Sequence, residues 1–257
     1  MEETLIEPVI HNQFHYEDGN PRTTIEKKTL NKKTALEIIG GSLSRTSKMP
    51  CLSWGISTAY CKTGRKLAKV KGTPCATCYV DRPTSRYRLS SVQKSHEKRL
   101  RALQHPKWVQ AMSFLIYLEL KNRGIQYFRW FDSGDLQGVE HLHLIVRVAK
   151  NVPEVRFWLP TQERKMVKVY RKIYGKEPDN LCIRFSNTKI DSYIDHSEFS
   201  PTSSVATKEH FSQLKDHGWQ MRCPVYLKKD SDPEKGKCGS CRMCWNSAVK
   251  HIFYQLH

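Results

Sequence analysis

Apolar residues along the chain follow two spacings, which alternate from about residue 50 onward. Compact runs rich in aromatic and β-branched residues occupy 51–56, 127–131, 155–159 and 181–185, with shorter runs at 204–206 and 219–222. Such runs predict β-strands. Helices are predicted where apolar positions recur every three or four residues. These stretches are 91–103, 107–123, 137–150, a stretch that ends at about 173, and 208–217.

Strands that alternate with helices are typical of parallel βα units. We therefore predict an α/β fold in the form of a partial or full (β/α) barrel of about six βα units. The barrel would carry cysteine-rich metal-binding loops and a cysteine-rich C-terminal segment. Three regions follow from the pattern. They are a polar basic N-terminal arm at 1–35, a barrel-like domain with a first cysteine cluster at 36–222, and a C-terminal cysteine-rich metal-binding segment and helix at 223–257.

Polar residues follow three of the predicted strands directly. In barrels of this type the functional site lies at the carboxyl ends of the strands, so these residues are expected to share a pocket. Ordinary turns would use the same residue types, which is the alternative reading. The candidate catalytic residues are Asp132, Asp135 and Glu163. The candidate substrate-binding residues beside them are Ser133, Gln162, Arg184 and Ser186.

Charge points to a polyanionic partner. The chain has 257 residues, with 43 Lys and Arg against 25 Asp and Glu, a net charge of +18. Such a surface favours nucleic acid, either DNA or RNA, through contacts with phosphates. Arg82, Arg86 and Tyr87 combine cationic and aromatic side chains and are assigned to substrate binding, although charge runs on helices are also common as solvated faces.

Nine cysteines in a chain without an apolar leader or membrane-spanning run indicate a reducing cytoplasm, where metal ligation is more natural than disulfide formation. Cys238, Cys241 and Cys244 recur at every third residue, and Cys223-Pro lies upstream. This spacing resembles a bacterial ferredoxin ligand set and predicts an iron–sulfur cluster of the 4Fe–4S type. Zinc is the alternative, although structural zinc usually takes two separate cysteine pairs.

A second group of cysteines precedes the predicted helices. Cys61, Cys75 and Cys78 could hold a second metal, and Cys51 could be a fourth ligand or a buried packing residue. Four ligands would form a closed structural site, whereas three would leave one iron open to a small molecule. The open arrangement resembles radical S-adenosylmethionine enzymes and would imply S-adenosylmethionine as a cofactor, although their usual CxxxCxxC spacing is absent.

Several motifs occur in an order that resembles the phage "gene product 88" family, from about residue 40 to the end. They are Lys48-Met-Pro, Cys61-Lys-Thr-Gly, Cys75-Ala-Thr-Cys78-Tyr, Arg129-Trp-Phe-Asp-Ser-Gly-Asp135, Phe157-Trp-Leu-Pro-Thr161 and Cys238-Gly-Ser-Cys-Arg-Met-Cys-Trp245. The resemblance implies a phage or prophage protein in the host cytoplasm. Residues 131–137 are also similar to a stretch of tRNA-guanine transglycosylases, which are barrels with a late cysteine-rich metal site.

Three functions remain open. The first is an iron–sulfur phage enzyme, radical S-adenosylmethionine-like, that acts on nucleic acid or a nucleotide. The second is a base-exchange or glycosylase-type barrel enzyme with structural metal sites, in which Asp132 or Asp135 is the nucleophile or base. The third is a non-enzymatic nucleic-acid-binding protein that metal ions stabilise.

Overall fold

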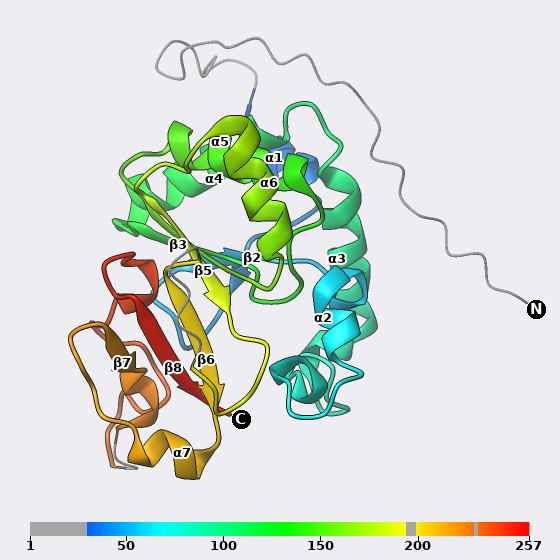
Figure 1. The fold of residues 1–257 in the computed structure, drawn as a ribbon. Helices are drawn as coiled ribbons and strands as arrows, with labels where there is room; N and C mark the ends of the chain where they lie inside the picture. Colours follow the sequence, from blue (N-terminus) through cyan, green and yellow to red (C-terminus); the bar gives the residue numbers. More distant parts are fainter. Residues whose placement is uncertain (1–29, 194–198, 229–230, 257) are drawn as a thin grey trace, which may run out of the picture.

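A single mixed sheet organises the molecule. The computed structural model describes residues 30–193, 199–228 and 231–256. Eight strands pair in the order β1-β2-β3-β4-β5-β6-β8-β7, and only β1 and β2 are antiparallel (Figure 1). The strands are β1 Ser44–Arg45, β2 Leu52–Trp54, β3 Tyr127–Trp130, β4 Arg156–Thr161, β5 Leu181–Ser186, β6 Thr202–Ala206, β7 Gln220–Arg222 and β8 His251–Gln255.

Helices cover one face of the sheet, and further helices lie in the connection that follows β2. On the covered face lie α1 Lys32–Ile38, α4 Trp108–Arg123, α5 Val139–Asn151 and α6 Arg164–Tyr174. The long connection from β2 to β3 also contains α2 Lys62–Leu67 and α3 Ser90–Ala102, and α7 Lys208–Gln213 follows β6. The main core forms where these helices meet the strands. Trp54, Trp108 and Trp130 are fully buried there, and the Trp54 and Trp108 rings lie 5.6 Å apart, edge to face.

Side chains alternate across the strands, so the sheet has two buried faces. In β4, Phe157 and Leu159 belong to the helix-covered core. Trp158 points the other way and packs with Cys51 and Trp245 in a second apolar cluster. The C-terminal segment therefore covers the face that the helices leave open.

The structure confirms the α/β class and most of the predicted elements, but it corrects the architecture. The sheet is open, with β1 and β7 at its edges, so the closed barrel is wrong. The predicted C-terminal helix is also wrong, because His251–Gln255 forms strand β8, which lies between β6 and β7. Residues 1–29 of the predicted arm lie outside the described residues, and α1 begins inside the arm at Lys32.

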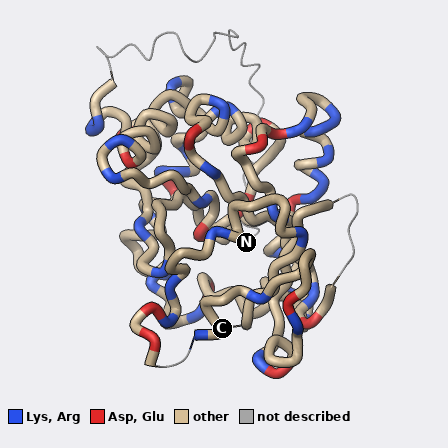
Figure 2. The backbone as a smooth tube through the Cα atoms, turned by 90° about the vertical axis from the view of Figure 1, so that its left-hand side faces the viewer, with Lys and Arg blue, Asp and Glu red and all other residues tan. Residues whose placement is uncertain are grey.

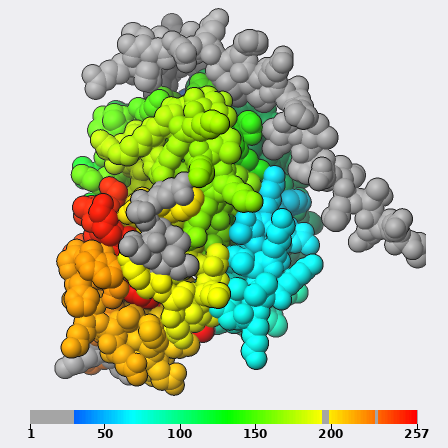
Figure 3. Space-filling view, viewed as in Figure 1, coloured from blue at the N-terminus to red at the C-terminus, as the bar shows by residue number. Residues whose placement is uncertain are grey.

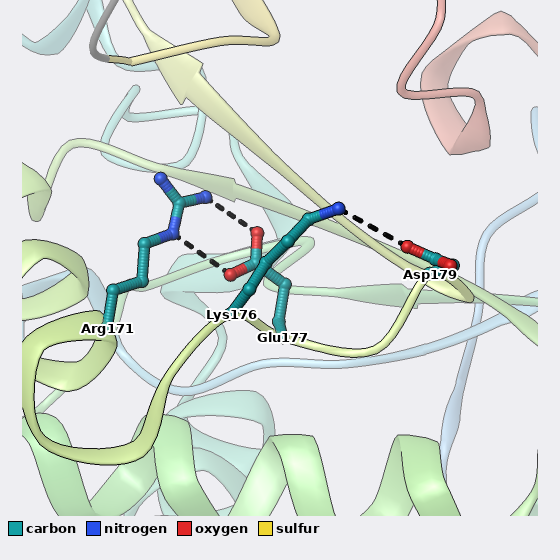
Figure 4. A network of polar contacts seen from close by, with 4 residues as sticks. All are labelled: Arg171, Lys176, Glu177 and Asp179. Carbon is teal, nitrogen blue, oxygen red and sulfur yellow. Dashed lines mark hydrogen bonds and ion pairs between the residues drawn. The ribbon is translucent and has the colours of Figure 1, made fainter.

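The loop between α6 and β5 is held by ion pairs (Figure 4). Arg171 binds Glu177 with two parallel hydrogen bonds of 2.6 and 3.0 Å, and Lys176 lies 3.3 Å from Asp179. Glu177 is nearly buried, so its pair is the stronger of the two. Among the described helices, none combines the length and apolar character needed to span a membrane.

Candidate metal centre and adjoining cavity

A cavity of about 790 Å³ lies at the carboxyl ends of the parallel strands. Segments that follow β2, β3, β4 and β5 line it together with the C-terminal segment. Six of its lining residues are cysteines: Cys61, Cys75, Cys78, Cys223, Cys238 and Cys244. Figure 3 shows the cyan segment around α2 and the orange C-terminal segment on opposite sides of the yellow residues. Two distant parts of the chain therefore bring thiols to one cavity.

The N-terminal cysteine group consists of Cys61, Cys75 and Cys78. Cys61 is the residue before α2, Cys75 lies in the 3₁₀ turn Pro74–Thr77, and Cys78 directly follows that turn. A Cβ atom added at Gly64 would stand 3.7 Å from the Sγ atoms of both Cys61 and Cys75, and 3.0 Å from the Cys61 Cβ. Glycine at this position thus leaves open the space beside two sulfurs.

These thiols lie close enough to affect one another. Burial, and after it the charges of Cys78 and Asp135, raises the pKa of Cys75 to about 12. Burial likewise raises the pKa of Cys78, against hydrogen bonds from the backbone of Val80 and Asp81 to its sulfur. Without a cation the group is therefore protonated at neutral pH, and a bound metal would be needed to hold it as thiolates.

The C-terminal cysteine group consists of Cys223, Cys238, Cys241 and Cys244, on the crossover between β7 and β8. The Cys223 N–H donates to the Phe253 carbonyl at 2.8 Å, and the Cys238 N–H donates to the Lys48 carbonyl at 2.9 Å. Burial, and next the charge of Cys244, raises the pKa of Cys223 to about 12. The other two thiols of the group also contribute to this shift, so the four side chains are near neighbours.

Cys51 belongs beside the C-terminal group, which corrects its assignment to the N-terminal cysteines. It is buried against Trp158 and Trp245. Burial raises its pKa to about 12, and the charges of Cys238 and Cys244 add to the shift. Cys182 is buried in β5 with Arg184 as its polar neighbour.

Neither group forms a compact single-ion site. Among the residues that the structure describes, no three His, Cys, Asp or Glu side chains converge as one metal ion would require. Sulfurs around one tetrahedral zinc lie roughly 3.8 Å apart, because the Zn–S bond is about 2.3 Å. An iron–sulfur cluster binds each thiolate through a different iron atom, so its ligand sulfurs can lie farther apart than those around one zinc ion. The all-sulfur donors suit an iron–sulfur cluster or zinc in type.

Glu163 holds α2 and lies outside the cavity lining. Its carboxylate accepts hydrogen bonds from the Thr63 N–H at 2.7 Å and from the Thr63 hydroxyl at 2.8 Å. Cys61, which precedes α2, gives no side-chain cap, so Glu163 supplies the negative charge that a helix N-terminus favours. Both carboxylate oxygens are thus engaged in fixing the position of the N-terminal cysteine group.

The two aspartates after β3 differ in their surroundings. Asp135 accepts hydrogen bonds from the Thr161 hydroxyl at 2.6 Å and from the N–H groups of Gln162 and Leu136 at 2.8 Å; burial raises its pKa to about 7. Asp132 accepts one from the Tyr87 hydroxyl at 3.2 Å, and its other carboxylate oxygen is buried without a hydrogen-bond partner. Asp132 therefore keeps a free acceptor, whereas Asp135 mainly joins β3 to β4.

Arg184 does not reach the cavity, which corrects its assignment to substrate binding. It is fully buried on β5 and donates to four backbone carbonyls. These are the carbonyls of Thr202, Asn246 and Val249 at 3.0 Å and of Met243 at 3.2 Å. Three of the four flank Cys244, so Arg184 fixes the C-terminal cysteine group to the sheet.

The other predicted binding residues lie around the cavity. The Ser133 hydroxyl donates to the Ile56 carbonyl and joins β3 to the end of β2. Gln162 donates to the Asn187 carbonyl at 3.1 Å, while its amide oxygen is buried without a partner. The other predicted binding residues, Ser186, Arg82, Arg86 and Tyr87, also line the cavity. Arg82 and Arg86 are exposed.

Sequence reasoning missed Arg129, which lines the cavity from β3. Its guanidinium lies 4.7 Å from the centre of the Trp158 ring, and Nη1 contacts the Met49 sulfur at 3.5 Å. Nε is buried without a hydrogen-bond partner. The available signal was a lone arginine in an aromatic strand, at a position that alternation directs away from the helices.

The family model described as Gene product 88 matches residues 15–247, which is most of the chain. The chain therefore belongs to the gene product 88 family. Searches of curated proteins and of solved structures returned no match.

Proposed function

We propose that this protein is an iron–sulfur enzyme that acts on nucleic acid or a nucleotide. The N-terminal cysteine group would hold the reactive centre, and the C-terminal group would hold an auxiliary one. The observation that carries the proposal is the convergence of both groups on one cavity at the carboxyl ends of parallel strands. Ligands of open α/β sheets bind at this edge.

Contacts to the sulfurs support iron–sulfur ligation. Backbone groups of Val80 and Asp81 donate to the Cys78 sulfur, and that of Val225 donates to the Cys223 sulfur. Such hydrogen bonds stabilise thiolate ligands of iron–sulfur clusters. Arg184 adds a buried cation near Cys244, and a buried cation requires nearby negative charge.

Residues around the cavity have separate roles in this proposal. If Cys61, Cys75 and Cys78 held an iron–sulfur centre, one iron would lack a protein ligand and could bind a small molecule such as S-adenosylmethionine. Arg129 offers a cation to an anionic group of the substrate, and the free oxygen atoms of Asp132 and Gln162 offer acceptors. Tyr87 orients Asp132 through its hydroxyl.

The charge beside the cavity supports a nucleic-acid or nucleotide substrate. Residues 61–101 contain twelve Lys and Arg against two Asp and Glu. In Figure 2, Lys and Arg are spread over the backbone more widely than Asp and Glu. Where this segment lines the cavity, the Tyr79 and Tyr87 rings lie 6.1 Å apart, and the Arg86 guanidinium lies 5.7 Å from the Tyr87 ring. Phosphate contacts with aromatic stacking are typical of single-strand binding.

A base-exchange or glycosylase reaction is the second candidate, and the free carboxylate oxygen of Asp132 favours it. In that reaction both metal sites would be structural. Asp132→Asn would abolish base release and leave nucleic-acid affinity unchanged. A binding protein without enzymatic activity is the third candidate, for which the charge of residues 61–101 is the support.

Anaerobic purification tests the proposal. The protein should be brown, with absorption at about 400 nm. Cys78→Ser should reduce that absorption, whereas Cys182→Ser, a matched change outside both groups, should not. Dithionite and S-adenosylmethionine should then yield 5′-deoxyadenosine. A colourless protein that contains zinc would contradict the iron–sulfur proposal, and a brown protein without this product would favour the other candidates.

A further inference from the structure

Cations surround the C-terminal cysteine group. Arg242 donates to the carbonyls of Gly239 at 2.6 Å and Cys241 at 2.8 Å, inside the cysteine loop itself. Lys228 donates to the Glu234 and Lys237 carbonyls at 3.0 and 3.1 Å, just before Cys238. Arg129 reaches the same group from β3, and its charge acts on both Cys51 and Cys238.

Arg184 is the most deeply buried of these cations. Its guanidinium contacts four carbonyls and, at 3.9 Å, the Cys182 sulfur, and within the described residues it makes no hydrogen bond to a carboxylate. Burying such a charge is costly unless negative charge lies nearby. Cys244 lies within range of its field, as does the Tyr254 hydroxyl, which is 3.2 Å from the Cys244 sulfur.

Carboxylates are the buried charges near the N-terminal cysteine group, whereas Arg82, the cation that acts on Cys78, is exposed. Glu163 binds Thr63, two residues after Cys61, and is nearly buried. Asp135 is also buried, and its three hydrogen-bond donors fit the ionised form at pH 8. Asp81, three residues after Cys78, accepts from Thr58 at 2.6 Å. The lysines of α2 are exposed, so water and salt screen their charge more strongly than that of the buried carboxylates.

The charge difference has a consequence for reduction. Reducing an iron–sulfur centre adds one negative charge, so neighbouring cations favour reduction and neighbouring carboxylates oppose it. We infer that these residues give the C-terminal centre the higher reduction potential, so that the first electron supplied to the protein resides there. This inference rests on the proposed function. The C-terminal group would then act as an electron store beside the cavity, filled before the N-terminal group is reduced.

A redox titration tests the inference without measuring enzyme activity. Anaerobic, iron-loaded protein at pH 8 is reduced stepwise with dithionite, and each centre is followed by electron paramagnetic resonance. The variant Cys61→Ala/Cys75→Ala/Cys78→Ala assigns the signals, because it retains only the C-terminal centre. We expect the signal retained in this variant to be the first to appear in the wild-type protein.

Single variants test the cause of the order. Arg129→Met should lower the ratio of reduced to oxidised C-terminal centre about tenfold at fixed potential, which corresponds to a reduction potential lower by about 59 mV. The potential of the N-terminal centre should stay unchanged. Glu163→Gln should raise the potential of the N-terminal centre. Arg171→Met, in α6 at the ion pair of Figure 4, should change neither centre.

The possible failures are distinguishable. Protein that binds no iron under any condition overturns the proposed function itself. Two centres that reduce in the opposite order, or together, overturn the inference but leave the iron–sulfur proposal intact. A single centre per chain also overturns the inference alone, and Arg129→Met without effect on either potential removes its stated cause.

Discussion

The two cysteine groups line the same cavity, but the chain anchors them with opposite charges. A carboxylate, that of Glu163, binds the start of α2 and fixes Cys61 from a position 100 residues later in the chain. A buried guanidinium, that of Arg184, binds the carbonyls around Cys244. The comparison teaches that a buried charge on or just after a strand can fix a cysteine-containing loop through its backbone.

The largest expected effect is at the C-terminal anchor. Arg184→Met would leave four carbonyls without their donor, and we expect the free energy of unfolding to fall by about 3–5 kcal/mol. Iron should be lost from the C-terminal group and retained by the N-terminal group. Denaturant unfolding and iron analysis measure both, with Arg171→Met as a matched control for iron content. Full iron content in Arg184→Met would show that the two anchors are not comparable.

His141, in the helix-covered core, contributes to stability independently of the anchors Glu163 and Arg184. Burial lowers the pKa of His141 to about 3, below the ordinary value of 6.5. The unfolded chain therefore takes up this proton first as pH falls, and stability is lost below pH 6.5. Between pH 6.5 and 5 the wild-type protein should lose about 2 kcal/mol more than His141→Gln. Equal pH slopes for the two proteins would contradict this.

At the N-terminal anchor a smaller effect is expected. Glu163→Gln would keep one acceptor for Thr63 and remove the charge at the start of α2, so unfolding should become easier by about 1–2 kcal/mol. Iron bound by Cys61, Cys75 and Cys78 should decrease, with the C-terminal group unaffected. Thermal unfolding and iron analysis of the same samples check both. A variant with wild-type iron content would mean that α2 holds its cysteine without Glu163.

The smallest change in stability separates folding from iron binding. Gly64→Ala should change stability by no more than about 1 kcal/mol, because the better helix propensity of alanine is opposed by a close contact. The new methyl group would stand 3.0 Å from the Cys61 Cβ and 3.7 Å from two sulfurs. We expect nearly unchanged thermal stability together with less iron in the N-terminal group. Wild-type iron content would show that the space beside these sulfurs is not used.

Periodicity predicted the fold best where strand and helix alternate with clear spacing, from β3 to β5. It failed at β8, because a short aromatic strand gains its partners only after the cysteine segment crosses the sheet. The cysteine spacings defined two groups, but they did not predict that both line one cavity or that Cys51 lies beside the second group. Hydrogen bonds to distant backbone atoms, which sequence cannot show, decided that Glu163 and Arg184 anchor loops and that Asp132 keeps a free oxygen.

Iron and sulfide analysis of anaerobically reconstituted protein tests the central claim most directly. Wild-type protein should hold about eight irons per chain if each group binds a 4Fe–4S cluster. Cys61→Ala/Cys75→Ala/Cys78→Ala and Cys238→Ala/Cys241→Ala/Cys244→Ala should each lose about half of that iron. Zinc in place of iron, or wild-type iron content in either triple variant, would contradict the account.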